Sequence, residues 1–321
     1  MFDTAHFPNA KTYWYEGKFY DWNEINIHPM AFALHYGGSV FEGIRAYKTS
    51  KGPAIFRLPE HIDRLFYSAS VARMNVPYRR EDVSDAIKAT LAKNQLPAAY
   101  IRPLLFYSYG NLGLRPTYCS VELLVGTWEW EAYLGDKTEK GASVCLLPWR
   151  RIHPSQMEMN AKLGGLYVQS MIAGLEARSL GFDEGVFLNL EGNIAEGCGE
   201  NIFVLRGGVL KTNDKTESIL EGITRASVLE IAQDLGYETR IGPILKEEFL
   251  TADEAFFTGT ACEIAPIVRV TDGSNAGGIH REYIIGSGQA GSATKRINRA
   301  FKEIVSGRNP KYEKWLTYVQ V

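Results

Sequence analysis

A mixed, charged segment at residues 128–140 divides the apolar pattern of the chain into two halves, with Gly135 inside it and Gly141 directly after it. Each half carries its own helix stripes and short strands, and the 321 residues suffice for two domains. We therefore predict an α/β protein in which a smaller α+β domain spans residues 1–131. An interdomain loop at 132–138 leads to a larger mixed α/β domain at 139–321.

The first half predicts a hairpin, two helices and two strands. Aromatic residues at 12–15 and 18–20 flank a Glu16-Gly17 turn. Apolar residues recur at helical spacing over 62–72, soon after Pro59, and again over 83–91. Segments 101–107 and 121–125 are typical of strands.

The second half is richer in short strands, predicted at 143–147, 185–190, 201–206, 209–212, 255–258 and 264–270. Apolar residues at 168, 171, 172 and 175 predict a helix that stops near Gly181. A second helix is expected after Thr224 and ends at Gly236, and a third carries Ile297, Phe301 and Ile304.

Composition argues against several classes of protein. The formal net charge is −2, without a basic stripe of the kind that binds nucleic acid. No apolar stretch approaches the roughly 18–20 residues that span a bilayer, and the first residues do not resemble a secretory signal. The four cysteines lie far apart, and the six histidines show no metal-ligand spacing. We expect a cytoplasmic protein without a metal, a membrane or a nucleic-acid partner.

Residues 286–291 match the G-x-G-x-x-G pattern of dinucleotide sites and precede a predicted helix. Such a site requires a βαβ unit with an acidic residue about 20 positions further on. Only 30 residues remain after Gly291, and they show no second strand. A glycine loop before a helix is the favoured interpretation.

Three other features are weak separately and compatible with one another. Lys162 stands beside Gly164 and Gly165 before an apolar helix, where an amine can form a Schiff base; such a lysine is also a common surface residue. Glu196 lies in a glycine-rich bend, which fits either an ordinary polar turn or a carboxylate that protonates a pyridine nitrogen.

The third feature is the segment at 220–225, directly before a helix. Free N–H groups at a helix N-terminus, together with the Thr224 hydroxyl, form a phosphate site; alternatively Thr224 only caps the helix. A second loop at 258–261 offers further hydroxyl and amide donors. Together the three features supply an amine, an acid and an anion cradle, which is the set that pyridoxal 5′-phosphate (PLP) requires.

At these residues the chain resembles the branched-chain amino-acid aminotransferases of PLP fold type IV, the D-amino-acid-aminotransferase-like fold. The similarity runs from about Tyr13 to about Phe301 and rests on several blocks in the same order. These blocks are 35–45 (HYGGSVFEGIR), 100–103 (YIRP), 196–203, 222–225 (GITR) and 259–261 (GTA).

The resemblance implies a role for each matching residue. Lys162 would be the catalytic residue, holding PLP and moving the proton between Cα and the cofactor, while Glu196 would pair with the pyridine nitrogen. The implied cofactor-binding set is Arg64, Lys162, Tyr167, Glu196, Gly222, Ile223, Thr224, Gly259 and Thr260. The implied substrate-binding set is Tyr36, Phe41, Gly43, Arg45, Tyr100, Arg102, Leu114, Trp130, Tyr133 and Ala261.

For the substrate side chain, the resemblance implies that Phe41, Trp130, Tyr133 and Tyr167 wall an apolar pocket. Tyr100 and the amides of Thr260 and Ala261 would hold the α-carboxylate. Tyr36, Arg102 and Leu114 would receive the side-chain carboxylate of glutamate, with Tyr36 and Leu114 from the partner subunit of a homodimer. Arginine pairs well with carboxylates, so one cavity can serve aliphatic and anionic side chains.

The expected reaction is a reversible amino transfer between L-leucine, L-isoleucine or L-valine and 2-oxoglutarate. The chain departs from many relatives at Gly38, Leu166 and Glu221, which bears on fine substrate preference, and it lacks the redox cysteine pair of some animal relatives. Rivals of the same fold are D-amino-acid transaminases, (R)-amine transaminases and aminodeoxychorismate lyases. A PLP-binding protein without catalysis is the rival from another class.

Overall fold

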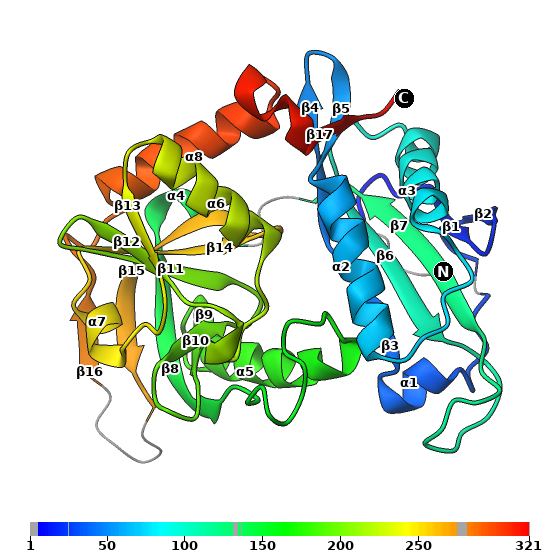
Figure 1. Ribbon diagram of the computed structural model, residues 1–321, viewed down its shortest axis with the longest axis horizontal. Helices are drawn as coiled ribbons and strands as arrows, with labels where there is room; N and C mark the ends of the chain where they lie inside the picture. The colour runs from blue at the N-terminus through cyan, green and yellow to red at the C-terminus, as the bar shows by residue number, and fades with distance from the viewer. Residues whose placement is uncertain (1–5, 25, 131–133, 136, 275–280, 321) are drawn as a thin grey trace. The chain divides into compact units, whose positions relative to one another are not determined.

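The computed structural model describes residues 6–24, 26–130, 134–135, 137–274 and 281–320. The chain forms two compact units, each described here by itself (Figure 1). Unit 1 comprises Met1–Glu131, Ala161–Tyr167 and Glu303–Val321, and unit 2 comprises Ala132–Asn160 and Val168–Lys302. The domain boundaries at 1–131, 132–138 and 139–321 remain a prediction.

Unit 1 is built on an antiparallel sheet with the strand order β17-β5-β4-β6-β7-β1-β2, and β3 pairs with β6 outside this path. The strands are β1 (Thr12–Tyr15), β2 (Lys18–Asp21), β3 (Ser39–Phe41), β4 (Ile44–Thr49), β5 (Gly52–Phe56), β6 (Ala99–Tyr107), β7 (Val121–Trp128) and β17 (Leu316–Tyr318). The predicted β1–β2 hairpin is confirmed. Glu16 and Gly17 both have positive φ angles (46° and 86°), as a tight turn matching the strand twist requires.

Two long helices of unit 1, α2 (Leu58–Val71) and α3 (Arg80–Asn94), confirm the helical spacing seen in the sequence. Pro59 lies in the first turn of α2, where its missing N–H costs no helical hydrogen bond. Ile62, Leu65 and Ala69 form the buried face of α2 and pack into one core with α3 and the sheet. The short helix α1 (Phe32–Tyr36) precedes β3.

Unit 2 is built on a mixed sheet with the strand order β10-β9-β8-β15-β14-β11-β12-β13, and β16 pairs with β15. Its strands are β8 (Ala142–Arg150), β9 (Glu184–Leu188), β10 (Ile194–Gly197), β11 (Asn201–Arg206), β12 (Val209–Thr212), β13 (Glu238–Ile241), β14 (Glu254–Gly259), β15 (Glu263–Asp272) and β16 (Arg281–Ile284). Strand β8 runs parallel to both β9 and β15. The other helices of the described chain are α4 (Lys137–Lys140), α5 (Tyr167–Ser179), α6 (Ile223–Asp234), α7 (Lys246–Leu250) and α8 (Ser292–Val305).

Helix α5 forms as predicted, but the apolar stripe that predicted it faces solvent in this chain. Val168, Met171, Ile172 and Leu175 are between 47% and 62% exposed. The buried side of α5 consists of small residues, Ser170, Ala173 and Ala177, because close packing against the sheet leaves little room.

The glycine motif at 286–291 does not lie in a βαβ unit. It connects β16, which is antiparallel to β15, to helix α8. The first turn of α8 already holds an anion from the chain itself, because Glu254 accepts hydrogen bonds from the amides of Ala293 (3.0 Å) and Thr294 (2.8 Å). A Cβ on Gly291 would lie 1.9 Å from the Glu254 carboxyl carbon. The motif therefore serves close packing and helix capping rather than a dinucleotide.

No described helix combines the length and the apolar character needed to cross a membrane. Within the part of the chain that the structure describes, no group of three or more His, Cys, Asp or Glu side chains is arranged to hold a metal ion. All four cysteines are free.

Candidate active site

Two hydrogen bonds to the backbone of Lys162 anchor this residue in unit 1. Its amide donates to the Ser68 hydroxyl on α2 (2.8 Å), and its carbonyl accepts from the Phe41 amide at the end of β3 (3.3 Å). The chain then enters a short 3₁₀ turn, Gly164–Leu166, whose glycines pass close to the segment before β3. A Cβ on Gly37 would lie 2.9 Å from the Cα of Gly165. The glycines beside the lysine therefore let two backbone segments approach.

The Lys162 amine lies among aromatic groups. Its Nζ atom donates to the Tyr167 hydroxyl at 2.6 Å and lies 5.0 Å and 4.9 Å from the centres of the Phe41 and Tyr167 rings. These two rings pack edge to face, with centroids 4.8 Å apart. The arrangement fixes the direction of the amine and gives it apolar walls.

A second cationic group lies against the same aromatic cluster. The Arg102 guanidinium lies 4.6 Å from the centre of the Phe41 ring, and its Nη2 donates to the Tyr100 hydroxyl (2.9 Å). Its Nε atom is buried and makes no hydrogen bond within the described chain. Gly43 makes room for this pair, because a Cβ there would lie 2.1 Å from the Tyr100 hydroxyl. Phe41, Gly43, Tyr100 and Arg102 thus form one connected group.

Aromatic side chains continue this group on the Tyr100 side. The Tyr100 and Trp130 rings lie 4.3 Å apart, and Trp130 is 38% exposed. Arg45 pairs with Tyr100 in the β4–β6 register and reaches the Trp130 carbonyl at 3.4 Å. Tyr133, also predicted for this pocket, lies outside the described residues.

Arg64, predicted to bind the cofactor phosphate, pairs with a residue that sequence reasoning missed. Its Nε and Nη2 atoms donate to the two carboxylate oxygens of Glu42 at 2.6 Å and 2.8 Å. His61, one turn earlier on α2, donates from Nδ1 to Glu42 at 2.7 Å. The i, i+3 spacing of His61 and Arg64 places both side chains on one face of a helix. Their shared partner, Glu42, lies 19 and 22 residues earlier in the chain, so the spacing alone does not reveal it.

Strong electrostatic coupling holds this group of three. Burial alone would raise the pKa of the Glu42 carboxyl, but the charge and hydrogen bonds of Arg64, with those of His61, hold that pKa well below its usual range. Burial lowers the pKa of His61, and the hydrogen bond to Glu42 opposes this only in part. At neutral pH the group therefore contains an ionised Glu42, a charged Arg64 and a neutral His61.

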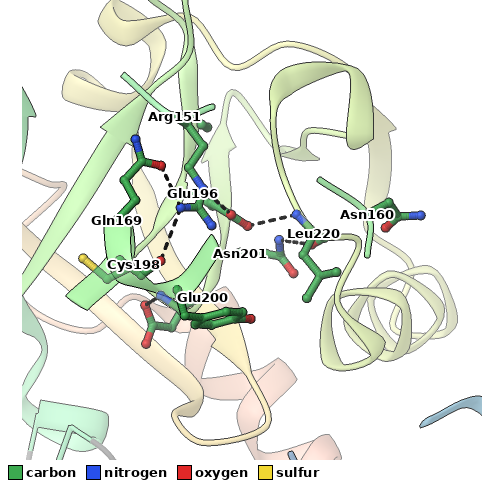
Figure 2. Close-up of polar contacts among 12 residues, drawn as sticks. Arg151, Asn160, Gln169, Glu196, Cys198, Glu200, Asn201 and Leu220 are labelled. Atoms are coloured by element: carbon green, nitrogen blue, oxygen red, sulfur yellow. Dashed lines mark hydrogen bonds and ion pairs between the residues drawn. The ribbon is translucent and has the colours of Figure 1, made fainter. Parts of the chain in front are cut away.

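Glu196 occupies strand β10 in unit 2 and is 5% exposed. Figure 2 shows Arg151 and the Leu220 amide approaching its carboxylate from different sides. Arg151 Nε donates to Oε1 at 2.9 Å, and the Leu220 amide donates to Oε2 at 3.1 Å. Arg151 is itself buried and also donates to Gln169 and Ser170 on α5. Sequence reasoning missed Arg151, because nothing local at the end of β8 indicates its partner.

The loop before α6 is held in place by two asparagines. Asn201 accepts from the Gly222 amide (3.0 Å) and donates to the Leu220 carbonyl (2.7 Å), while Asn160 accepts from the Glu221 amide (3.0 Å). A Cβ on Gly222 would lie 2.2 Å from Asn201 Oδ1, so glycine is required at this close approach.

Helix α6 begins at Ile223 with Gly222 as its N-cap, and no side chain caps it. The prediction of a helix after Thr224 is thus correct to within one residue, and Thr224 is not the cap. Its amide and those of its neighbours form the anion-binding end of a 12-residue helix.

Gly259, Thr260 and Ala261 form the turn between β14 and β15. Gly259 ends β14, and Thr260 and Ala261 are partly exposed. In unit 1, Tyr36 and Leu114 are 47% and 83% exposed, and the Tyr36 hydroxyl donates to the Leu112 carbonyl at 2.8 Å. The predicted site residues therefore fall into two groups, those of unit 1, which include Lys162, and those of unit 2, which include Glu196.

The family model for class IV aminotransferases matches residues 39–270, which include most of both groups. The chain therefore belongs to the class IV aminotransferase family. It is 40% identical to the branched-chain-amino-acid aminotransferase of Pseudomonas aeruginosa, over 96% of this chain and 97% of the relative. The enzyme of the same name from Escherichia coli K12 is 39% identical, over 95% and 96% of the two chains.

Solved structures agree. A crystal structure of the T.th. branched-chain amino acid aminotransferase, complexed with N-(5′-phosphopyridoxyl)-L-glutamate, superposes with a TM-score of 0.89 at 41% identity, covering 98% of this chain and all of that one. The E. coli enzyme gives a TM-score of 0.91 at 38% identity, covering 97% and 100%. The predicted family, fold class, enzyme class, PLP dependence and branched-chain aminotransferase activity are confirmed.

The residues present fit the cofactor. Lys162 supplies an oriented amine, Glu196 a buried carboxylate fixed by two donors, and the α6 N-terminus a set of uncapped amides beside the Thr224 hydroxyl. These are the groups that an aldehyde, a pyridine nitrogen and a phosphate respectively require.

Proposed function

We propose that this chain catalyses reversible amino transfer between L-leucine, L-isoleucine or L-valine and 2-oxoglutarate. The observation that carries the proposal is the Phe41 ring, whose centre lies 5.0 Å from the Lys162 amine and 4.6 Å from the Arg102 guanidinium. An aliphatic side chain can pack on such aromatic walls, and a carboxylate can bind the arginine. One cavity can therefore accept both kinds of substrate.

In this proposal Lys162 binds the cofactor covalently and then carries the proton to and from the substrate Cα. PLP, when bound, supplies the electron sink that makes this proton removable. The Tyr167 hydroxyl orients the lysine amine. Glu196 holds a proton on the pyridine nitrogen, and Arg151 keeps that carboxylate in place.

The phosphate is proposed to bind at Gly222, Ile223 and Thr224, at Gly259 and Thr260 of the β14–β15 turn, and at Arg64. The uncapped start of α6 supports this assignment, since helix N-termini attract anions. Tyr100 and the Thr260 and Ala261 amides are assigned to the substrate α-carboxylate, and Arg45 and Gly43 support Tyr100. Phe41, Trp130, Tyr133 and Tyr167 are assigned to the apolar wall.

We further propose that the working enzyme is a homodimer in which Tyr36 and Leu114 reach the partner's active site beside Arg102. Two observations support a homodimer: the exposure of Leu114, and the exposed apolar stripe of α5, which is unusual on a monomer. Four free thiols are in keeping with a cytoplasmic location.

The absorption spectrum of the purified protein tests the proposal. Bound PLP should colour it yellow, L-leucine should bleach the colour, and 2-oxoglutarate should restore it. Bleaching by D-alanine or an (R)-amine alone would transfer the assignment to another enzyme of the same fold. A bound cofactor that responds to no amino donor would contradict catalysis.

A further inference from the structure

Glu42 is a fully buried carboxylate that the proposed reaction does not use directly. It lies in the link between β3 and β4, where its amide donates to the Pro103 carbonyl at 3.0 Å. Both of its carboxylate oxygens accept hydrogen bonds from α2: Oε1 from Arg64 Nε (2.6 Å), and Oε2 from Arg64 Nη2 (2.8 Å) and His61 Nδ1 (2.7 Å). One carboxylate therefore fixes two side chains of a neighbouring helix.

Stability alone is a poor explanation for such a group. Taking two charges out of water is costly, and apolar residues of similar volume usually serve a core equally well. What the pair provides is orientation. Two parallel hydrogen bonds to the Nε edge fix the plane of the Arg64 guanidinium, and therefore the direction in which its remaining donors point.

An arginine side chain has many rotamers, and a ligand that binds a mobile arginine must supply the free energy to order it. Arg64 is ordered by its bonds to Glu42 and by burial, because its side chain is only 12% exposed. Lys162 lies close enough for its charge to disfavour protonation of His61. The backbone of Lys162 is also attached to α2, because its amide donates to the Ser68 hydroxyl, four residues after Arg64 (2.8 Å).

We propose that Glu42 is a positioning residue that holds the Arg64 guanidinium ready for the cofactor phosphate, with His61 fixing the Glu42 carboxylate. The inference rests on the role of Arg64 given under the proposed function. Its chemistry is local: an ionised Glu42 balances the charge of Arg64 and fixes the arginine plane. Without it, Arg64 would remain buried and charged but would lose the two bonds that fix the plane of its guanidinium.

The test is the dissociation constant of PLP, measured by absorbance titration of the apoenzyme, for Glu42→Gln, Arg64→Gln and the double variant. Glutamine keeps the volume and can still accept from His61, but it cannot bind Arg64 through two acceptors. Loss of an outer-shell partner typically weakens a site by about 10–100-fold, and we expect a change of that size for Glu42→Gln. If Glu42 acts through Arg64, the double variant should bind PLP no more weakly than Arg64→Gln alone.

The control is Glu254→Gln, which removes a carboxylate that caps α8 in unit 2 and should leave the PLP constant unchanged. Should Glu42→Gln fail to fold, Glu42→Asp retains the charge but withdraws it by one methylene, and it should also weaken PLP binding. An unchanged PLP constant in a folded Glu42 variant, or additive losses in the double variant, would overturn the inference. An unchanged constant in Arg64→Gln would instead remove the phosphate role of Arg64.

Discussion

The Nζ atom of Lys162 lies 2.6 Å from the hydroxyl oxygen of Tyr167, five residues further along the chain. The contact arises because a 3₁₀ turn at Gly164–Leu166 leads directly into α5, which begins at Tyr167. The same short segment thus provides both the amine and the group that orients it. Several measurable consequences depend on this segment and on the contacts around it.

Lys162→Ala should retain the fold and lose nearly all turnover. The Lys162 amine donates a hydrogen bond to the Tyr167 hydroxyl, and we expect the fold to tolerate the loss of this single bond. Losing both covalent binding and the proton carrier should lower kcat by on the order of 10⁴-fold. Activity with L-leucine and 2-oxoglutarate, beside a circular dichroism spectrum, measures both effects. Wild-type turnover would rule out the role of Lys162.

Tyr167→Phe should leave the protein folded and lower its kcat/KM moderately. Phenylalanine keeps the ring that packs on Phe41 but removes the hydroxyl that accepts from the lysine. One lost hydrogen bond is worth about 1 kcal/mol, so kcat/KM with L-leucine should fall by roughly fivefold. An unchanged kcat/KM would mean that the hydroxyl does not orient the amine.

Arg102→Ala should separate the two kinds of substrate. Removing one partner of a buried charged contact costs about 2–5 kcal/mol, so kcat/KM with L-glutamate should fall on the order of 100-fold. Loss with L-leucine should stay below about tenfold, because an aliphatic side chain needs no cation. Equal losses for both donors would show that the anionic end of the pocket lies elsewhere.

Arg151→Met should destabilise unit 2 strongly. It leaves Glu196 buried without its charged partner, and breaking such a pair costs about 3–5 kcal/mol. Arg151→Lys is the matched control: it retains the charge but cannot reach Glu196, Gln169 and Ser170 together, so a smaller loss is expected. Urea unfolding measures both variants. A wild-type midpoint for Arg151→Met would contradict the structural importance of the pair.

His61 should make the apoprotein less stable in mild acid. Its pKa is lowered in the folded protein, so below the unfolded value of about 6.5 the unfolded chain binds a proton that the folded chain does not. Stability from His61 is therefore present above a pH of about 6.5 and is lost as the pH falls through it. Glu42 adds a similar loss only below about pH 4.3.

Melting temperatures at pH 7.5, 6.0 and 5.0 test this dependence. The decline between pH 7.5 and 5.0 should be smaller in His61→Gln, whose amide can still donate to Glu42 without titrating. The same decline in both proteins would assign the acid sensitivity to other groups.

Much of the secondary structure could be predicted because it depends on local patterns. The Glu16-Gly17 turn identified the first hairpin, and strands β11 and β12 lie at 201–206 and 209–212, where they were predicted. Segments of unit 1 such as β3, β4 and β5 were not predicted. Strands β4 and β5 pair with each other as a local hairpin that the apolar pattern does not mark. Their other partners, β6 and β17, and the partner of β3, which is β6, lie far along the chain.

The site shows the same limit. Lys162, Glu196 and the start of α6 could be named because glycines and a helix start mark them in the sequence, and the family blocks added the rest. Arg151 and Glu42 could not, because each acts through a partner brought near only by folding. The helix stripe at 168–175 predicted α5 correctly, although those residues are exposed within one chain.

Strand β17 pairs with β5, and the Trp315 carbonyl just before it accepts from the Arg57 amide at 2.7 Å. The sheet of unit 1 is therefore incomplete until residues 316–318 have been translated, long after β5 itself. Until then β5 presents an open edge, of the kind that recruits other strands. That edge therefore stays open throughout the synthesis of unit 2, whose residues lie between β5 and β17 in the chain.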